Sequence, residues 1–284
     1  MIRTVTVIGA GTMGAEIAAL AALGGYETYL HDNSSDALML AGARLQSRLH
    51  AMEEKGKIGE GAGRLALARL HFEPVLERAV READFVIEAV YEDLELKRRI
   101  FADLDRLAPA HAVLATNSST IVSSRIADAT GRPAKVINMH FFTPPLVMEI
   151  VEVVQGPHVA DETVAATVEV AMAMGRQPAL LKKETFGFVA NRVLGAILNE
   201  ALKIVADGVC SHEEVDQIVQ KALGHTLPPF RILDLVGNDV AWYVGQERAR
   251  WTGNPADGPS PLLTEKVQRG ELGRKTGKGW YTYG

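Results

Sequence analysis

Two residues in the middle of the chain could together supply acid–base chemistry. His140 ends one hydrophobic run, and Glu152 lies within a second run that is rich in valine. A carboxylate beside an imidazole holds its tautomer and stabilises the imidazolium form, which makes a usable base near neutral pH. Pro144 and Pro145 lie between the runs and predict a connection, because proline cannot donate a hydrogen bond to a sheet. We predict two joined strands that lay His140 beside Glu152; the alternative is a surface histidine and an unrelated strand carboxylate.

A glycine-rich loop near the start of the chain has the spacing of a dinucleotide-binding turn. The β-branched run at residues 4–9 predicts a strand buried in a parallel sheet, and GAGTMG and a helical run follow at once. Gly9 permits the tight turn, Gly11 lets a pyrophosphate approach the backbone, and Gly14 lets the helix pack against the strand. The helix N-terminus supplies amides and a positive dipole for phosphates. We therefore predict a dinucleotide site here.

The second predicted strand, residues 27–31, ends at Asp32. An acid about twenty residues beyond the glycines is where an acceptor for the adenosine ribose hydroxyls is expected. A carboxylate there would repel a 2′-phosphate, so Asp32 predicts NAD as the cofactor in preference to NADP. The alternative is that Asp32 serves only as the N-cap of the helix that follows it.

Further polar groups follow two later predicted strands. Glu88 and Glu92 lie at the carboxyl end of the strand FVIEAV, and Lys97 lies on the amphipathic helix after it. Open α/β sheets bind ligands at the carboxyl ends of their strands. The alternative for Lys97 is an i,i+4 ion pair with Asp93. The next strand ends in NSST, residues 117–120, which offers hydrogen-bond donors at the same edge or, alternatively, a polar turn that caps the next helix.

Residues 34–71 are predicted to be helical and to end in a basic, glycine-containing segment. Arg48, Lys55 and Lys57 are the cations of this region that could meet a phosphorylated substrate. The alternative is a solvated helical hairpin whose charges only face water.

Composition narrows the class of protein. The chain has 284 residues, enough for roughly two domains, and its net charge of -5 argues against a nucleic-acid partner. Cys210, the single cysteine, cannot form an internal disulfide or a cysteine-based metal site; this indicates a reducing compartment, and we predict no bound metal. No apolar run is long enough to span a bilayer, and the N-terminus enters a strand without a signal-peptide pattern. We predict a cytoplasmic protein with no membrane partner.

The sequence changes character near residues 185–187. We predict a Rossmann-like α/β domain at residues 1–186 and an all-helical domain at residues 187–284. Three helices are expected in the second part, at residues 188–208, 212–224 and 230–251. Their apolar faces exceed what the helical part can bury alone, so we expect them to pack on the first domain and on a second subunit, as a homodimer.

With these residues in place, the chain resembles the L-3-hydroxyacyl-CoA dehydrogenases, particularly the bacterial 3-hydroxybutyryl-CoA dehydrogenases. The resemblance covers nearly the whole chain, and several long motifs in one order are more specific than any one alone. The motifs are GAGTMG at 9–14, EAVYEDLELKRRIF at 88–101, ATNSST at 115–120, HFFTPPLVMEIVEV at 140–153, GFVANRV at 187–193 and GRKTGKGWY at 273–281.

The resemblance implies roles for individual residues. It implies that His140 is the catalytic base with Glu152 as its partner, and that Ser119 and Asn191 bind and polarise the substrate. It implies that Lys55 approaches the CoA moiety, beside the Arg48 considered above. The cofactor contacts expected within the motifs and strand ends are Gly9, Gly11, Thr12, Met13, Gly14, Asp32, Ala89, Glu92, Lys97, Asn117, Thr143 and Lys275. The family fold, a Rossmann-like domain followed by a helical dimerisation domain, agrees with the domains predicted above.

Three positions depart from the usual family pattern. Thr143 replaces the asparagine of HFFNP, where a hydroxyl could substitute for the amide. In GHTLPPFRILD, Pro228 replaces a glycine and Arg231 replaces an acidic residue. The family places this segment near the active-site cleft, so acyl chain length or substrate class could differ.

The leading hypothesis is a reversible NAD-linked oxidation of an L-3-hydroxyacyl-CoA, with a short acyl chain such as 3-hydroxybutyryl-CoA, to the 3-ketoacyl-CoA. One alternative is a related dehydrogenase of a free hydroxy acid such as L-gulonate or carnitine, in which Arg231 would meet the carboxylate; a surface salt bridge is the simpler role for Arg231. Another alternative is a binding or structural protein that keeps the fold without catalysis.

Overall fold

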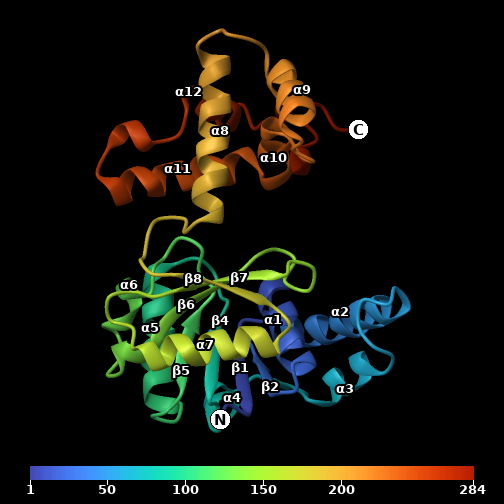
Figure 1. The fold of residues 1–284 in the computed structure, drawn as a ribbon, viewed down its shortest axis with the longest axis vertical. Helices are drawn as coiled ribbons and strands as arrows, with labels where there is room; N and C mark the ends of the chain where they lie inside the picture. The colour runs from blue at the N-terminus through green and yellow to red at the C-terminus, as the bar shows by residue number, and fades with distance from the viewer. The chain divides into compact units, whose positions relative to one another are not determined.

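The computed structural model describes residues 1–284, which form two compact units, Met1–Phe188 and Val189–Gly284. Figure 1 shows that the first unit contains a sheet covered by helices and that the second unit is helical. The predicted fold class is therefore confirmed. None of the helices combines the length and the apolar character that crossing a bilayer would need.

A single eight-stranded sheet organises the first unit. Its order is β3-β2-β1-β4-β5-β6-β7-β8. All neighbouring pairs from β3 to β6 are parallel, β7 is antiparallel to β6, and β8 is parallel to β7. The strands are β1 (Thr4–Ile8), β2 (Glu27–His31), β3 (Leu70–Glu73), β4 (Phe85–Glu88), β5 (Val113–Thr116), β6 (Val136–Phe141), β7 (Ile150–Val154) and β8 (Gln177–Leu181).

Helices cover both faces of this sheet because its strands carry apolar side chains on both faces. Val7 and Ile87 pack with Leu20 of α1 in one core, whereas Val86 packs with Phe101 of α5 in a second core. Each parallel crossover thus buries its helix against the sheet. The helices of this unit are α1 (Thr12–Leu23), α2 (Ser35–Glu54), α3 (Ala62–Ala68), α4 (Leu76–Val80), α5 (Leu94–Leu107), α6 (Ser124–Ala127) and α7 (Asp161–Ala173), with a 3-10 turn η1 (Pro133–Lys135).

The prediction of helix throughout residues 34–71 is wrong at its end. The helices α2 and α3 do form, but Leu70 begins strand β3, which pairs in parallel with β2. Leu70 is buried, and the ring of Phe72 lies against Gly42 of α2. Pairing with β2 supplies backbone hydrogen bonds and burial that a four-residue segment cannot signal by itself.

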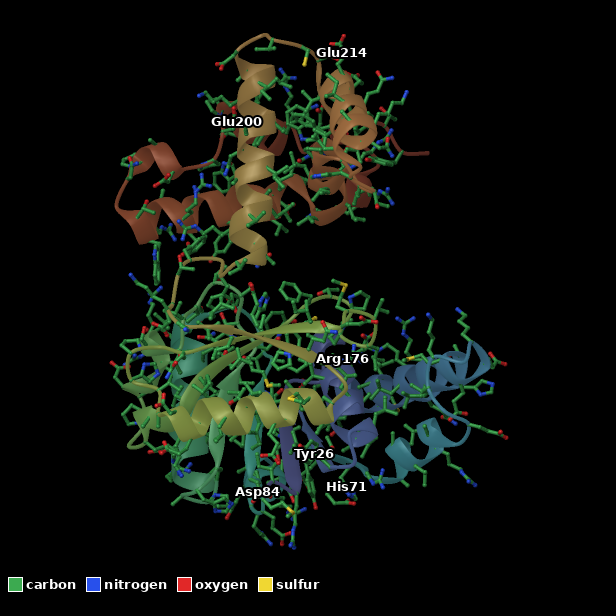
Figure 2. All side chains as sticks on the ribbon, viewed as in Figure 1. Tyr26, His71, Asp84, Arg176, Glu200 and Glu214 are labelled. Carbon is green, nitrogen blue, oxygen red and sulfur yellow. The ribbon has the colours of Figure 1, made fainter.

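Two side chains labelled in Figure 2 join segments of the first unit that are distant in sequence. Asp84, just before β4, accepts a hydrogen bond of 3.0 Å from the N–H of Thr4, at the start of β1. Arg176, just before β8, donates a hydrogen bond of 2.8 Å to the carbonyl of Met148, in the connection between β6 and β7. The Arg176 contact holds this connection, which separates His140 from Glu152.

The second unit packs its helices around a small core that includes Leu202, Phe230, Leu233 and Leu263. The helix α9 starts with a capping box in which Ser211 and Glu214, the latter labelled in Figure 2, exchange hydrogen bonds. Its elements are α8 (Ala190–Ala206), α9 (His212–Leu223), α10 (Pro229–Val236), α11 (Asn238–Thr252) and α12 (Pro261–Gln268), with 3-10 turns η2 (Pro255–Asp257) and η3 (Arg274–Thr276).

The single helix predicted at residues 230–251 is wrong, because it is two helices. Gly237 separates α10 from α11 with φ 108° and ψ 127°, a conformation that L side chains rarely adopt. A Cβ at residue 237 would also lie 2.8 Å from a carboxylate oxygen of Asp239. The break between α10 and α11 therefore follows from the backbone freedom of Gly237 and from the close packing around this residue. The apolar pattern continues across the break, so the sequence did not predict it.

Candidate active site

The glycine loop presents an uncapped helix N-terminus. Gly9 has φ 106°, and a Cβ on Gly14 would lie 1.8 Å from the carbonyl oxygen of Gly9, so only glycine fits at residue 14. Gly11 is the N-cap of α1, no side chain caps that helix, and a Cβ on Gly11 would meet nothing within 4 Å. Backbone N–H groups with open space beside them are the donors that a pyrophosphate needs. The loop therefore fits the phosphates of NAD.

Asp32 connects the end of β2 to this loop. Its carboxylate accepts hydrogen bonds of 2.9 Å from the N–H of Ala10 and from the N–H of Ser34. The N-cap of α2 is Ser34, which accepts from the N–H of Ala37. The alternative role of Asp32 as the N-cap is therefore wrong. Asp32 lies half-buried beside the glycine loop, with its charge where the adenosine ribose is expected.

A buried ion-pair network lies at the carboxyl end of β4. Lys97 Nζ lies 2.6 Å from Glu88 Oε1 and 3.4 Å from Glu92 Oε2, and the Lys97 side chain is 1% exposed. Glu88 also accepts hydrogen bonds from the Thr116 hydroxyl and the N–H of Val90, at 2.6 and 2.7 Å. The alternative pairing of Lys97 with Asp93 is therefore wrong; that carboxylate instead caps α5.

Glu92 extends the network toward the segment at residues 117–120. Its carboxylate accepts hydrogen bonds from the hydroxyls of Ser118 and Thr120. Burial alone would raise the pKa of Glu92, but the charge of Lys97 and these hydrogen bonds outweigh burial and hold the pKa below its ordinary value. Glu92 is therefore a carboxylate that stays ionised and is tied to the loop after β5.

The segment at residues 117–120 is held from two sides. Asn117 accepts a hydrogen bond of 2.9 Å from the N–H of Phe141, at the end of β6. Asn138, fully buried on β6, donates to the carbonyl of Ile121 at 3.1 Å. These contacts leave Ser119 half-buried, with no hydrogen bond of its own hydroxyl in this unit. The segment is thus a positioned loop rather than a cap of α6, whose N-cap residue makes no side-chain cap bond.

His140 and Glu152 meet as the sequence predicts. They are opposite each other in the antiparallel register of β6 and β7, and His140 Nδ1 lies 2.8 Å from Glu152 Oε2. Their side chains are 7% and 4% exposed. A carboxylate at Nδ1 favours the proton on Nδ1 and leaves the Nε2 lone pair as the acceptor. The alternative of a surface histidine is therefore wrong.

The connection after His140 also contacts the cofactor loop. The Thr143 hydroxyl donates to Met13 Sδ at 3.1 Å, and the N–H of Leu146 donates to Glu16 at 3.0 Å. Both acceptors lie on α1, whose N-terminus is the glycine loop. The structure thus brings the His140 end of β6 beside the predicted phosphate site. Ala89, another predicted cofactor contact, packs against Gly9 and Gly14 in the same region.

The predicted CoA-contacting cations lie on α2 and are not drawn into this cluster. Arg48 Nε lies 3.9 Å from Glu16 Oε1, a long ion pair, and Lys55 is exposed at the end of α2. Arg44, one turn before Arg48, donates a hydrogen bond of 3.3 Å to the carbonyl of Ala10. Sequence reasoning missed Arg44, although its i,i+4 spacing from Arg48 places both arginines on one face.

The remaining predicted residues belong to the second unit. Asn191 is exposed in the first turn of α8, and Lys275 Nζ lies 2.6 Å from Asp239. Arg231 stacks its guanidinium 3.6 Å from the centre of the Tyr281 ring. This cation–π contact, and not the surface salt bridge considered from the sequence, occupies Arg231. Pro228 is the N-cap of α10.

The sheet, the uncapped glycine loop and the buried histidine–carboxylate pair beside it define a class, the NAD-dependent dehydrogenases. Within that class the chain belongs to the 3-hydroxyacyl-CoA dehydrogenase family. Residues 4–185 match the 3-hydroxyacyl-CoA dehydrogenase NAD-binding domain, and residues 187–283 match the C-terminal domain of the same family. The predictions of this family, of NAD as cofactor and of an oxidoreductase are confirmed.

Individual relatives are similar to this chain along nearly the whole length of both proteins. A 3-hydroxybutyryl-CoA dehydrogenase of Mycobacterium tuberculosis is 37% identical, over 99% of this chain and 99% of the relative. The crystal structure of an (S)-3-hydroxybutyryl-CoA dehydrogenase from Ralstonia eutropha is 34% identical, covers 100% of both chains and has a TM-score of 0.95. A diketoreductase that acts on dicarbonyl compounds is 34% identical, covers 99% of both chains and has a TM-score of 0.85.

Proposed function

We propose that this enzyme oxidises a short-chain L-3-hydroxyacyl-CoA, 3-hydroxybutyryl-CoA, to the 3-ketoacyl-CoA, and that the reaction is reversible. The observation that carries the proposal is the buried His140–Glu152 pair, whose strand continues into a connection that contacts Met13 of the glycine-loop helix. A base that must serve a hydride transfer has to lie beside the cofactor. The names of the relatives support the acyl-CoA substrate.

His140 is the general base in this proposal. Its Nε2 accepts the proton of the substrate hydroxyl, while Glu152 holds Nδ1–H and offsets the charge of the resulting imidazolium. Ser119 and Asn191 donate hydrogen bonds to the substrate oxygens as charge moves onto them. Bound NAD supplies the hydride acceptor. In the reverse direction His140 returns the proton from Nε2.

The cofactor contacts follow from the open glycine loop and the polar groups around it. The N–H groups after Gly11 hold the pyrophosphate, Asp32 accepts from the ribose, and Arg48 and Lys55 receive the phosphates of CoA. The contacts that we assign to NAD are Gly9, Gly11, Thr12, Met13, Gly14, Asp32, Ala89, Glu92, Lys97, Asn117, Thr143 and Lys275. Lys97 would act mainly through Glu92, because its Nζ already pairs with two carboxylates.

We further infer a cytoplasmic homodimer that assembles through the helical part of the chain, with the domain boundary at residues 186–187. Exposed apolar side chains in the second unit support the dimer, because monomers rarely expose large contiguous apolar patches. The single cysteine, which cannot form an internal disulfide, supports a reducing compartment.

The test is an absorbance assay at the NADH band with (S)-3-hydroxyacyl-CoA substrates of graded chain length. We expect the highest kcat/KM with the four-carbon substrate and little activity with the (R) isomer. A maximum of kcat/KM with a longer acyl chain would keep the enzyme in the family but change its substrate from 3-hydroxybutyryl-CoA to a longer 3-hydroxyacyl-CoA. Equal turnover of free 3-hydroxybutyrate would instead support the alternative of a free hydroxy acid.

A further inference from the structure

Phe188 has an unusual backbone. It is the only residue other than glycine with a positive φ, at 50°, and its side chain is 0% exposed. The left-handed region is unfavourable for a residue with a bulky side chain, because Cβ approaches the carbonyl oxygen. Such a conformation persists only where the surroundings hold it, and it is often found at functional sites.

The surroundings that hold Phe188 include the candidate base. Its ring packs in a small cluster with Val122 and Val154, and its ring centre lies 5.6 Å from the centre of the His140 imidazole, at an interplanar angle of 51°. Phe142 provides a second ring contact to His140, at 4.7 Å and 62°. These contacts lie in the first unit, of which Phe188 is the last residue.

The imidazole needs these contacts to have a single orientation. The hydrogen bond from Nδ1 to Glu152 restrains one atom of the ring, but rotation about the last side-chain bond of histidine has a broad energy profile. Flat apolar neighbours restrict that rotation, and the two phenyl rings are such neighbours. Nε2, which has to meet the substrate hydroxyl, is then held in one direction.

We propose that Phe188 is a positioning residue for His140, and that the left-handed backbone at residue 188 sets where its ring lies. The proposal rests on the proposed function in one respect, that His140 is the base. The same proposal explains why Phe188 has a strained, left-handed backbone. Residue 188 is followed directly by the second unit and its helix α8, so the chain must turn at this residue and still place the phenyl ring on His140.

Four variants separate positioning from general packing. Phe188→Leu keeps an apolar side chain but removes the ring, and Phe188→Ala removes the side chain while keeping the backbone strain. Phe188→Gly removes the side chain and the strain together. The matched control is Phe101→Leu, since Phe101 is also 0% exposed in the first unit but packs in the core between α5 and the sheet.

The first measurement is the His140 Nδ1–H signal in proton–nitrogen NMR of the apoenzyme. We expect a sharp signal in the wild type and in Phe101→Leu, and a broadened or lost signal in Phe188→Leu and Phe188→Ala. An unchanged signal in both Phe188 variants would overturn the proposal. This readout needs no turnover, so it stands apart from the test of the proposed function.

The second measurement is steady-state kinetics. Phe188→Leu should lower kcat by about ten- to a hundredfold, the loss expected from a misplaced catalytic group, with KM for NAD within about twofold of the wild type. Phe188→Gly should be at least as stable to urea as Phe188→Ala but no more active, because the ring is absent from both. Equal losses of kcat in Phe188→Leu and Phe101→Leu would show a packing role only and overturn the proposal.

Discussion

His140 and Glu152 are directly opposed on antiparallel strands, with Nδ1 2.8 Å from Oε2 and both side chains almost fully buried. A pair of this kind should act as a unit. His140→Ala removes the proton acceptor and should lower kcat by about two to four orders of magnitude. Adding Glu152→Gln to it should cost little more, as is found for residues that work together. Fully multiplicative losses would contradict the pairing.

The charge of Glu152 should matter beyond its shape. Glu152→Gln keeps the shape of the side chain but removes the charge that offsets the imidazolium formed on His140 during oxidation. The kcat for oxidation should therefore fall in Glu152→Gln. NAD affinity, measured by fluorescence titration, should stay near the wild-type value in both single variants. An unchanged kcat in Glu152→Gln would show that Glu152 does not act on the base.

Lys97 should stabilise the fold through Glu88. Lys97→Met leaves two carboxylates without their cation, and the one on Glu88 is 0% exposed, which costs about 3–5 kcal/mol in comparable cases. Adding Glu88→Gln removes the fully buried charge and should restore more than half of the loss in urea unfolding, because the Glu92 side chain is 32% exposed. Arg98→Met is the control, because Arg98 lies on the same helix but pairs with Asp128 near the surface, and its loss should be far smaller.

Glu271 should make the stability of the second unit depend on pH. Hydrogen bonds from Lys266 and Lys278, at 2.7 Å each, lower its pKa to about 2. A carboxyl with a depressed pKa stabilises the fold above its ordinary pKa of 4.5, and this stabilisation is lost as pH falls toward 2. The difference in unfolding free energy between wild type and Glu271→Gln should thus be constant above about pH 5 and shrink below it.

Urea unfolding at several pH values between neutral and acid would measure that difference. Glu265→Gln is the matched control, since Glu265 pairs with Arg269 at the surface of the same unit and is 52% exposed. Its difference from wild type should stay small throughout. A Glu271→Gln difference that does not shrink in acid would contradict the role of the two lysines.

Asp32 should set the preference for NAD. A 2′-phosphate brought against this carboxylate would meet like charge, which costs several kcal/mol, so kcat/KM should favour NAD over NADP by at least about a hundredfold. Asp32→Asn keeps an acceptor for the N–H of Ala10 while removing the charge. This substitution should narrow the preference for NAD, because it removes the repelling carboxylate while the cationic Arg44 still contacts the same loop through the carbonyl of Ala10. Equal use of both cofactors by the wild type would refute the assignment.

The dimer should assemble through α11. Val240, Tyr243 and Val244 are spaced at three and four residues, are 43%, 47% and 37% exposed, and lie on one face of this helix. Light scattering at micromolar concentration should give the mass of a dimer, and Val240→Glu with Val244→Glu should give a monomer. Met39→Glu, at an exposed apolar residue of α2, should leave the dimer intact. A monomeric wild type would contradict the proposal.

The sequence by itself determined the features that depend on local conformation. The glycines at residues 9, 11 and 14 predict a tight turn, the close approach of a pyrophosphate to the backbone and an open helix N-terminus. Sequence is enough for this, because each of these features depends on the backbone of only a few consecutive residues. The two hydrophobic runs and the prolines between them predict joined strands that can lay His140 beside Glu152. The register that places the two residues opposite each other came from the assembled sheet, because both strands are buried on both faces and burial alone does not choose a register.

Only the tertiary structure decided the partners that depend on packing between distant elements. The i,i+4 spacing alone suggested that Lys97 pairs with Asp93. In the folded protein Lys97 instead points inward and pairs with Glu88. A buried carboxylate attracts a nearby cation more strongly than a solvated carboxylate does, because the local dielectric constant is lower. The strand at Leu70 and the contact of Phe188 with His140 likewise needed the assembled sheet. The stability of these contacts depends on burial and on pairing between residues that are distant in sequence, and neither is a property of a short stretch of sequence.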